Sequence, residues 1–199
     1  MGAILALARE RPASQSAAEA SRWTRRTTRP GIALGVIVAV AVAMRVNNGL
    51  RYPALHGYDG FGHVTYVWYL LKNHRIPLAH EGWEHFHPPL YYAICALIWA
   101  PLASVEPKHV LQVLGLVFSI VGLISAWVSY AIARRYFSER PLGWLVAPAF
   151  VLLLPVHIYT APMIGNEGLN TALCSAALYF LLRSLQTCLL YTSDAADEL

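Results

Sequence analysis

Charged residues are scarce in this sequence. Of its 199 residues only 13% are charged, about half of what a soluble domain of this size carries, and 57% are hydrophobic. The window Val110 to Ala133 contains no charged residue. Such a window is long enough to cross a bilayer core of about 30 Å at a rise of about 1.5 Å per helical residue. The composition therefore excludes an ordinary soluble domain and predicts an all-α, polytopic membrane protein.

Cysteine is also rare, and no CxxC pair is present to suggest a redox or zinc site. Cys95, Cys174 and Cys188 lie in or beside apolar segments, where cysteine is usually a small core residue. The formal charge of +4 does not indicate a nucleic-acid partner, because the basic residues cluster at the ends of predicted helices.

The two ends of the chain differ in composition from the middle. Residues 1–30 are rich in Ala, Ser and Arg, and we expect a disordered cytoplasmic tail rather than a cleaved signal peptide. Residues 188–199 resemble translated sequencing-adapter read-through, so we expect a truncated chain with a non-native end. The native membrane domain would then cover residues 31–187.

Four windows are long enough to span a membrane: about 31–48, 110–133, 141–158 and 168–187. A fifth, Pro89 to Val105, is shorter and contains Pro101. The positive-inside rule predicts that the basic segment 133–140 is cytoplasmic. The order of the spans allows this only if the fifth window lies along the membrane interface and does not cross it. The N-terminus is then cytoplasmic, residues 49–108 form an external loop, and the 160–168 connection is external as well.

The external loop carries the most unusual residues. Residues 58–73 predict a short helix whose apolar stripe, Val64, Val67, Trp68 and Leu71, would dip into lipid. Asp59 stands at its start, either as an N-cap or as a catalytic base facing a cavity.

Further along, the segment WEHFHPPLYY (83–92) combines histidines, prolines and aromatic residues that suit a headgroup layer. His63, His85 and His87 with Glu81 or Glu84 either bind a divalent metal or only form hydrogen bonds. Glu167 and Asn166 either cap the last helix, or Glu167 shares a polar cavity with Asp59.

Four features together resemble a known group of proteins. They are the Asp59-x-x-x-His63 helix, the HPPLYY segment, a span that ends in ARRYF, and an external acidic residue that opens the last span. The pattern is similar to the N-terminal part of the GT-C superfamily of polytopic glycosyltransferases, which includes protein O-mannosyltransferases and aminoarabinose transferases. The resemblance covers about residues 31–186. It implies transfer of a sugar from a polyprenyl-phosphate donor to an acceptor hydroxyl on a glycan, lipid or protein, with inversion, on the extracytoplasmic side.

By this resemblance Asp59 is the general base and Glu167 orients substrate or binds a metal where one is used. His87, Pro88 and Pro89 match the family's proline motif on the donor side. We also expect His63, Tyr91 and Asn166 to bind substrate. The candidates for holding the anionic lipid phosphate are the external histidines and three basic residues, Lys72, Arg75 and Lys108. Many relatives carry a second acid after the first, whereas Gly60 follows Asp59 here.

Two other classes of protein remain open. A transporter fragment would show charged or broken helices near the middle of the membrane, and a non-catalytic membrane scaffold would need no acidic site. The sequence indicates no particular cofactor and leaves a divalent metal open. We expect membrane lipid and no nucleic acid as a partner, and a location in the bacterial plasma membrane.

Overall fold

The computed structural model describes the backbone of residues 13–197 and, except at Ala54 and Pro141, the side chains of residues 29–185. Residues 13–197 contain no strand, so the all-α prediction is confirmed. In chain order the helices are α1 (Ala13–Arg51), η1 (Ala54–His56), α2 (Gly60–Asn73), α3 (Leu90–Trp99), η2 (Ala100–Leu102), α4 (Pro107–Val121), α5 (Leu123–Tyr136), α6 (Pro141–Leu153), α7 (Pro155–Thr160) and α8 (Glu167–Asp197).

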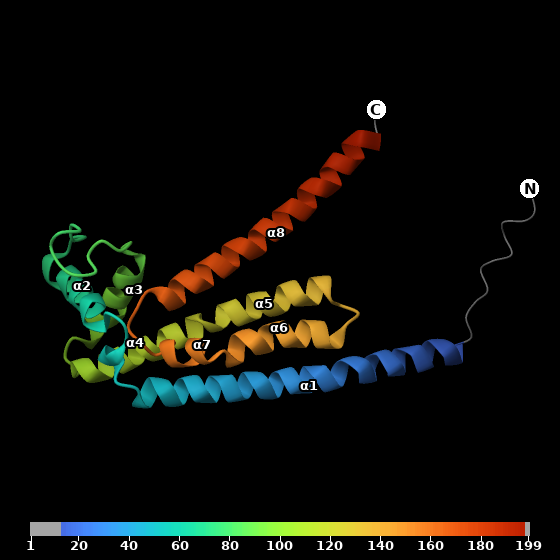
Figure 1. Ribbon diagram of the computed structural model, residues 1–199, viewed down its shortest axis with the longest axis horizontal. Helices are drawn as coiled ribbons and strands as arrows, with labels where there is room; N and C mark the ends of the chain where they lie inside the picture. The colour runs from blue at the N-terminus through green and yellow to red at the C-terminus, as the bar shows by residue number, and fades with distance from the viewer. Residues whose placement is uncertain (1–12, 198–199) are drawn as a thin grey trace, which may run out of the picture.

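The long helices form an elongated bundle in which α1, the α4–α5 pair and α6–α7 run side by side (Figure 1). The predicted window 110–133 forms α4 and α5, which meet at Gly122. The window 141–158 is broken where Leu154 adopts an extended ψ of 119°. This conformation is the one that a residue before proline prefers, here Pro155.

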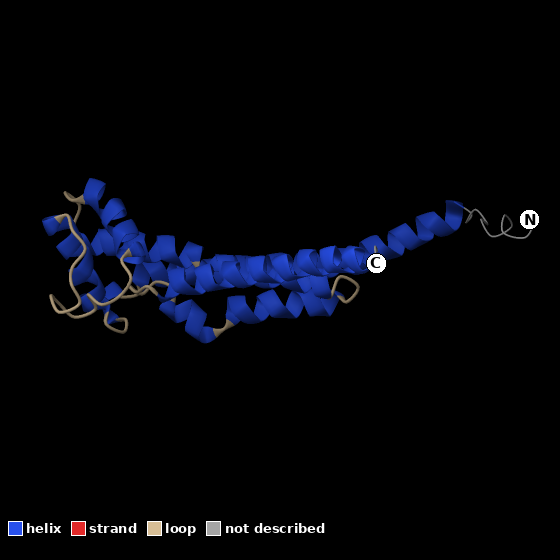
Figure 2. Cartoon of the chain, turned by 90° about the horizontal axis from the view of Figure 1, so that it is seen from above, coloured by secondary structure: helices blue, strands red, loops and turns tan. Residues whose placement is uncertain are grey.

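All connections predicted to be external lie at one end of this bundle. The end of α1, the start of α4, the end of α7 and the start of α8 meet there, together with α2 and α3 (Figures 1 and 2). The α5–α6 connection, which contains Arg140, lies at the opposite end. The connections predicted to be external and the one predicted to be cytoplasmic therefore lie at opposite ends of the bundle, while their sidedness stays a prediction.

The segment 89–105 does not extend the bundle. It forms the ten-residue α3 and the short η2, and α3 packs against α2 and α4 at the site end. The apolar stripe of α2 is turned inward, because Val64 is 1% exposed and Val67 is fully buried in the cluster shared with α3 and α4. The prediction that this stripe faces lipid is wrong for these two valines, which instead pack against neighbouring helices.

Within the part of the chain that the structure describes, two helical segments are long and apolar enough to cross a membrane, Arg29–Arg51 and Pro107–Tyr136. Leu90–Leu102 and Leu142–Leu153 are apolar but shorter. The chain upstream of residue 31 differs from the prediction, because α1 already begins at Ala13 and residues 13–30 are helical rather than disordered. Residues 1–12 lie outside the described part. At the other end, α8 continues through residues 188–197 without a break, and the origin of that stretch stays a prediction.

Candidate functional site

Asp59 occupies the N-cap position of α2, but its carboxylate makes no capping hydrogen bond. Its backbone has a φ of 53°, a left-handed conformation that aspartate tolerates better than most residues. The side chain is exposed, and its Oδ1 accepts a long hydrogen bond of 3.4 Å from the indole nitrogen of Trp83. The carboxylate is thus held loosely, and most of its hydrogen-bonding capacity is available to a ligand.

A hollow beside Asp59 is lined by Thr65 and His85 as well as Trp83. His85 is 6% exposed, and both of its ring nitrogens are buried without a hydrogen-bond partner. Its ring lies edge-on to Tyr69, with the ring centroids 5.3 Å apart. A buried imidazole normally has a partner for at least one nitrogen, so the two unpartnered nitrogens of His85 are an exception in this part of the fold.

Behind the hollow, α2 and α3 are joined by a buried histidine–tyrosine pair. The Nδ1 atom of His63 lies 2.7 Å from the hydroxyl of Tyr92, and Tyr92 stacks on Tyr66 at a centroid distance of 3.8 Å. On the loop side, the Nε2 atom of His87 lies 2.6 Å from a carboxylate oxygen of Glu84, which is buried. Both predicted substrate-binding histidines therefore have protein partners, and His63 is 2% exposed.

Burial lowers the pKa of His63, and the negative charges of Glu167, Glu84 and Asp59 partly oppose that shift. His63 is therefore neutral at neutral pH, and it forms one hydrogen bond with the hydroxyl of Tyr92. Burial is also the main cause that raises the pKa of Tyr92. The two acids that the sequence singled out, Asp59 and Glu167, thus both act electrostatically on the same histidine.

Arg75 is engaged by Glu81 and does not stand free to bind a phosphate. Its Nη1 and Nη2 atoms lie 2.9 and 2.5 Å from the two oxygens of Glu81, which also accept hydrogen bonds from the Tyr69 hydroxyl and the Leu78 amide. The prediction that Arg75 holds a lipid phosphate is therefore not supported, because its guanidinium already makes a two-point ion pair. Lys72 is exposed in the last turn of α2.

The ion pair leads to a prediction about pH. The Arg75 guanidinium, the Leu78 amide and the Tyr69 hydroxyl lower the pKa of Glu81 to about 2. A carboxylate with a lowered pKa stabilises the folded form above its unfolded pKa of about 4 and loses that contribution as pH falls through about 2. Arg75→Gln should raise the pKa of Glu81 toward about 4, as measured by carboxyl-carbon NMR. Lys72→Gln is the matched control, and an equal shift in that variant would contradict the assignment.

The remaining predicted residues have mixed positions. Tyr91 is 2% exposed, and its hydroxyl accepts a hydrogen bond of 3.0 Å from the Gly165 amide. It therefore fixes the 161–166 loop and is not open to substrate. Pro88 is exposed, while Asn166 is half-buried and its carbonyl accepts the Asn170 amide at 2.9 Å. Glu167 is exposed in the first turn of α8, where a carboxylate is stabilised by the helix dipole.

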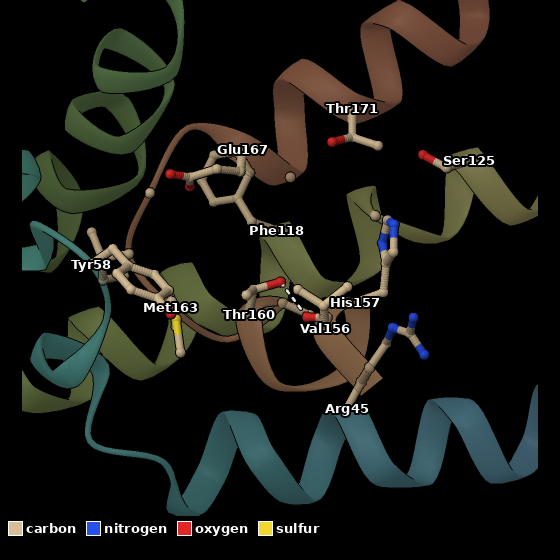
Figure 3. Close-up of a pocket in the computed structure, with 15 residues that line it drawn as sticks. Arg45, Tyr58, Phe118, Ser125, Val156, His157, Thr160, Met163, Glu167 and Thr171 are labelled. Atoms are coloured by element: carbon tan, nitrogen blue, oxygen red, sulfur yellow. Dashed lines mark hydrogen bonds between the residues drawn. The ribbon is translucent and has the colours of Figure 1, made fainter. Parts of the chain in front are cut away.

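Asp59 and Glu167 do not line one cavity. Asp59 borders the hollow with His85, whereas Glu167 borders a second cavity between α1, α4–α5, α7 and α8 (Figure 3). The predicted cavity shared by the two acids is therefore not found among the described residues, because each acid borders a different cavity. The described residues also contain no group of three His, Cys, Asp or Glu side chains placed to hold a metal ion.

The second cavity brings together residues that the sequence analysis overlooked. Arg45, Ser125 and His157 line it, and Arg45 is only 4% exposed although it lies within the candidate span Arg29–Arg51. One signal was available in the sequence, because a lone charge inside an apolar run is costly in a membrane and usually has a function. Ser125 and His157 had no comparable signal.

No protein-family model, no curated protein and no solved structure matches this chain.

Proposed function

We propose that the chain is part of a polytopic membrane glycosyltransferase that uses a polyprenyl-phosphate sugar, with Asp59 as the general base. The observation that carries the proposal is the weakly held carboxylate of Asp59 in a hollow that also contains the unpartnered nitrogens of His85. The exposed carboxylate can contact an acceptor hydroxyl, and a positioned carboxylate is a common base in such reactions.

The surface of the bundle supports a membrane location. Side chains along α1 such as Ile32, Val36 and Leu50 are more than half exposed, and the same holds for Phe150 on α6 and Phe180 on α8. A soluble protein rarely leaves so extensive an apolar surface exposed, whereas lipid would cover it. The site end adds exposed aromatic residues that suit a headgroup layer: Tyr58, Phe61, Trp83 and Phe86.

The distribution of charge supports the orientation. Arg134, Arg135 and Arg140 are at the end of the bundle opposite to the site, where the N-terminal part of α1 also lies (Figure 1). The positive-inside rule would make that end cytoplasmic. Asp59 would then face the extracytoplasmic side, where a lipid-borne sugar and its acceptor can meet at the membrane surface.

In the proposed reaction Asp59 accepts the proton of the acceptor hydroxyl while the acceptor oxygen attacks the anomeric carbon. The bond from that carbon to the phosphate oxygen breaks, and the polyprenyl phosphate leaves with the electron pair. A single displacement inverts the anomeric configuration and needs only one carboxylate. This scheme therefore agrees with Gly60 after Asp59 and gives Glu167 no direct role in proton transfer.

The experiment supplies membranes containing the protein with a radiolabelled polyprenyl-phosphate sugar and a panel of acceptors. We expect release of polyprenyl phosphate that depends on the acceptor, together with a product of inverted anomeric configuration by NMR. Membranes from cells that lack the protein give the background. Release that does not exceed this background with any acceptor would contradict the proposal.

A transporter is the second candidate, and one observation favours it. Arg45 is buried within α1, directly beside the point where α6 ends and α7 begins, so a charge and a broken helix occur together. Sealed vesicles containing the protein would then take up a labelled solute without releasing lipid phosphate. Measuring solute uptake and lipid-phosphate release in the same preparation distinguishes the two functions.

A further inference from the structure

We propose that the cavity lined by Arg45, Ser125 and His157 binds a compact oxyanion of the phosphate class. The cavity has a volume of about 330 Å³ and is lined by residues of α1, α4–α5, α7 and the start of α8 (Figure 3). It is separate from the hollow beside Asp59. The inference concerns binding alone and stands whether or not the protein transfers a sugar.

The first reason is that Arg45 is buried with its charge uncompensated. Its Nη1 atom donates to the carbonyl oxygens of Ala41 at 3.3 Å and Leu152 at 3.1 Å, but its Nε atom is buried without a partner. Among the described residues no carboxylate forms an ion pair with it. Burying an unpaired charge is expensive, so a bound anion would remove a large unfavourable contribution.

The second reason comes from another helix. The hydroxyl of Ser125 on α5 is buried, has no hydrogen-bond partner and borders the same cavity. His157 on α7 lies next to Arg45, and Thr171 on α8 also lines the cavity (Figure 3). Helices α1, α5, α7 and α8 thus each contribute a residue with hydrogen-bond donors to the lining of one cavity. Two of these donors, on Arg45 and Ser125, are unsatisfied.

The chemistry of these groups selects the class of ligand. A guanidinium matches the planar pair of oxygens of a phosphate or carboxylate, and hydroxyl and imidazole donors suit the further oxygens of a tetrahedral anion. Glu167 lies at the other end of the cavity from Arg45 (Figure 3) and repels an anion there. The negative group is therefore expected at the Arg45 end, with hydroxyl-bearing parts of a larger ligand toward Glu167.

The test measures thermal unfolding of the full chain in neutral detergent as inorganic phosphate is added at constant ionic strength. We expect a saturable rise in the melting temperature. Ser125→Ala removes one hydrogen bond to a charged ligand, without unpairing any protein group, and should weaken phosphate binding about tenfold. Arg45→Gln should abolish the response, and Arg51→Gln, an exposed arginine on the same helix, should leave it unchanged.

A second arm identifies the source of the phosphate group. The protein is placed in nanodiscs of phosphatidylcholine with or without phosphatidic acid, and its melting temperature is compared. Stabilisation by phosphatidic acid alone, lost in Ser125→Ala, assigns the site to a lipid headgroup, and stabilisation by inorganic phosphate alone assigns it to a free anion. No saturable effect in either arm, or an equal effect in Ser125→Ala and the unaltered protein, overturns the proposal.

Discussion

Replacing Asp59 with Asn is expected to reduce the rate of sugar transfer by about 10²- to 10⁴-fold, the usual contribution of general base catalysis. The amide has nearly the same shape as the carboxylate, and its oxygen can still accept the 3.4 Å hydrogen bond from Trp83. It cannot take a proton from the acceptor hydroxyl. The rate of polyprenyl-phosphate release should therefore fall while the folded structure and donor binding are kept.

Glu106→Gln is the matched control, because its side chain is 68% exposed at the same end of the bundle and borders neither cavity. We expect this variant to transfer sugar at the unaltered rate. A scaffold would give a different pattern, since Asp59→Asn would then leave its assembly and all its measured properties intact. A rate within twofold of the unaltered protein for Asp59→Asn would remove Asp59 from the reaction.

Much of the architecture was predictable because its determinants are local in the sequence. Uninterrupted apolar windows indicate long helices, and clusters of arginine indicate which ends of successive helices lie at the same end of the bundle. The break before Pro155 follows from the restriction that proline places on Leu154. The length of the segment 89–105 left its placement open, and the positive-inside rule predicted that it lies along the interface.

The partners of an apolar face were not predictable in the same way. The stripe with Val64 and Val67 has the same helical spacing whether it faces lipid or protein, and only the tertiary structure shows that α3 and α4 cover it. The same limit applies to Asp59 and Glu167. Both were placed at one end of the bundle, but no sequence pattern indicates that they border different cavities.

Arg75 and Tyr91 show a related limit. Their residue types fit a phosphate or sugar site, yet each is occupied by a protein partner that cannot be anticipated from spacing. Arg75 binds Glu81, and Tyr91 accepts the Gly165 amide across 74 positions. Arg45 shows the opposite case, because a single charge inside an apolar run is a signal that the sequence itself contains.

Replacing Gly115 with Ala is expected to destabilise the protein, although alanine normally stabilises a helix relative to glycine by about 0.5–1 kcal/mol. A Cβ atom at this position of α4 would lie 2.7 Å from the carbonyl oxygen of Pro162, which belongs to the backbone and cannot turn away. Overpacking of this kind costs about 1–3 kcal/mol, so the melting temperature in detergent should fall by about 2–12 °C.

Gly35→Ala is the matched control, since nothing lies within 4 Å of a Cβ atom at that position of α1. It should melt at the same temperature as the unaltered protein or slightly above it. A melting temperature for Gly115→Ala that equals that of Gly35→Ala would mean that α4 and the 161–166 loop are not in contact.

The 161–166 loop also lines the Arg45 cavity. It carries the Gly165 amide bound by Tyr91 and leads directly into Glu167, so the close approach at Gly115 determines the position of one wall of that cavity. Phosphate binding in Gly115→Ala should therefore weaken together with stability, whereas in Gly35→Ala both should be kept.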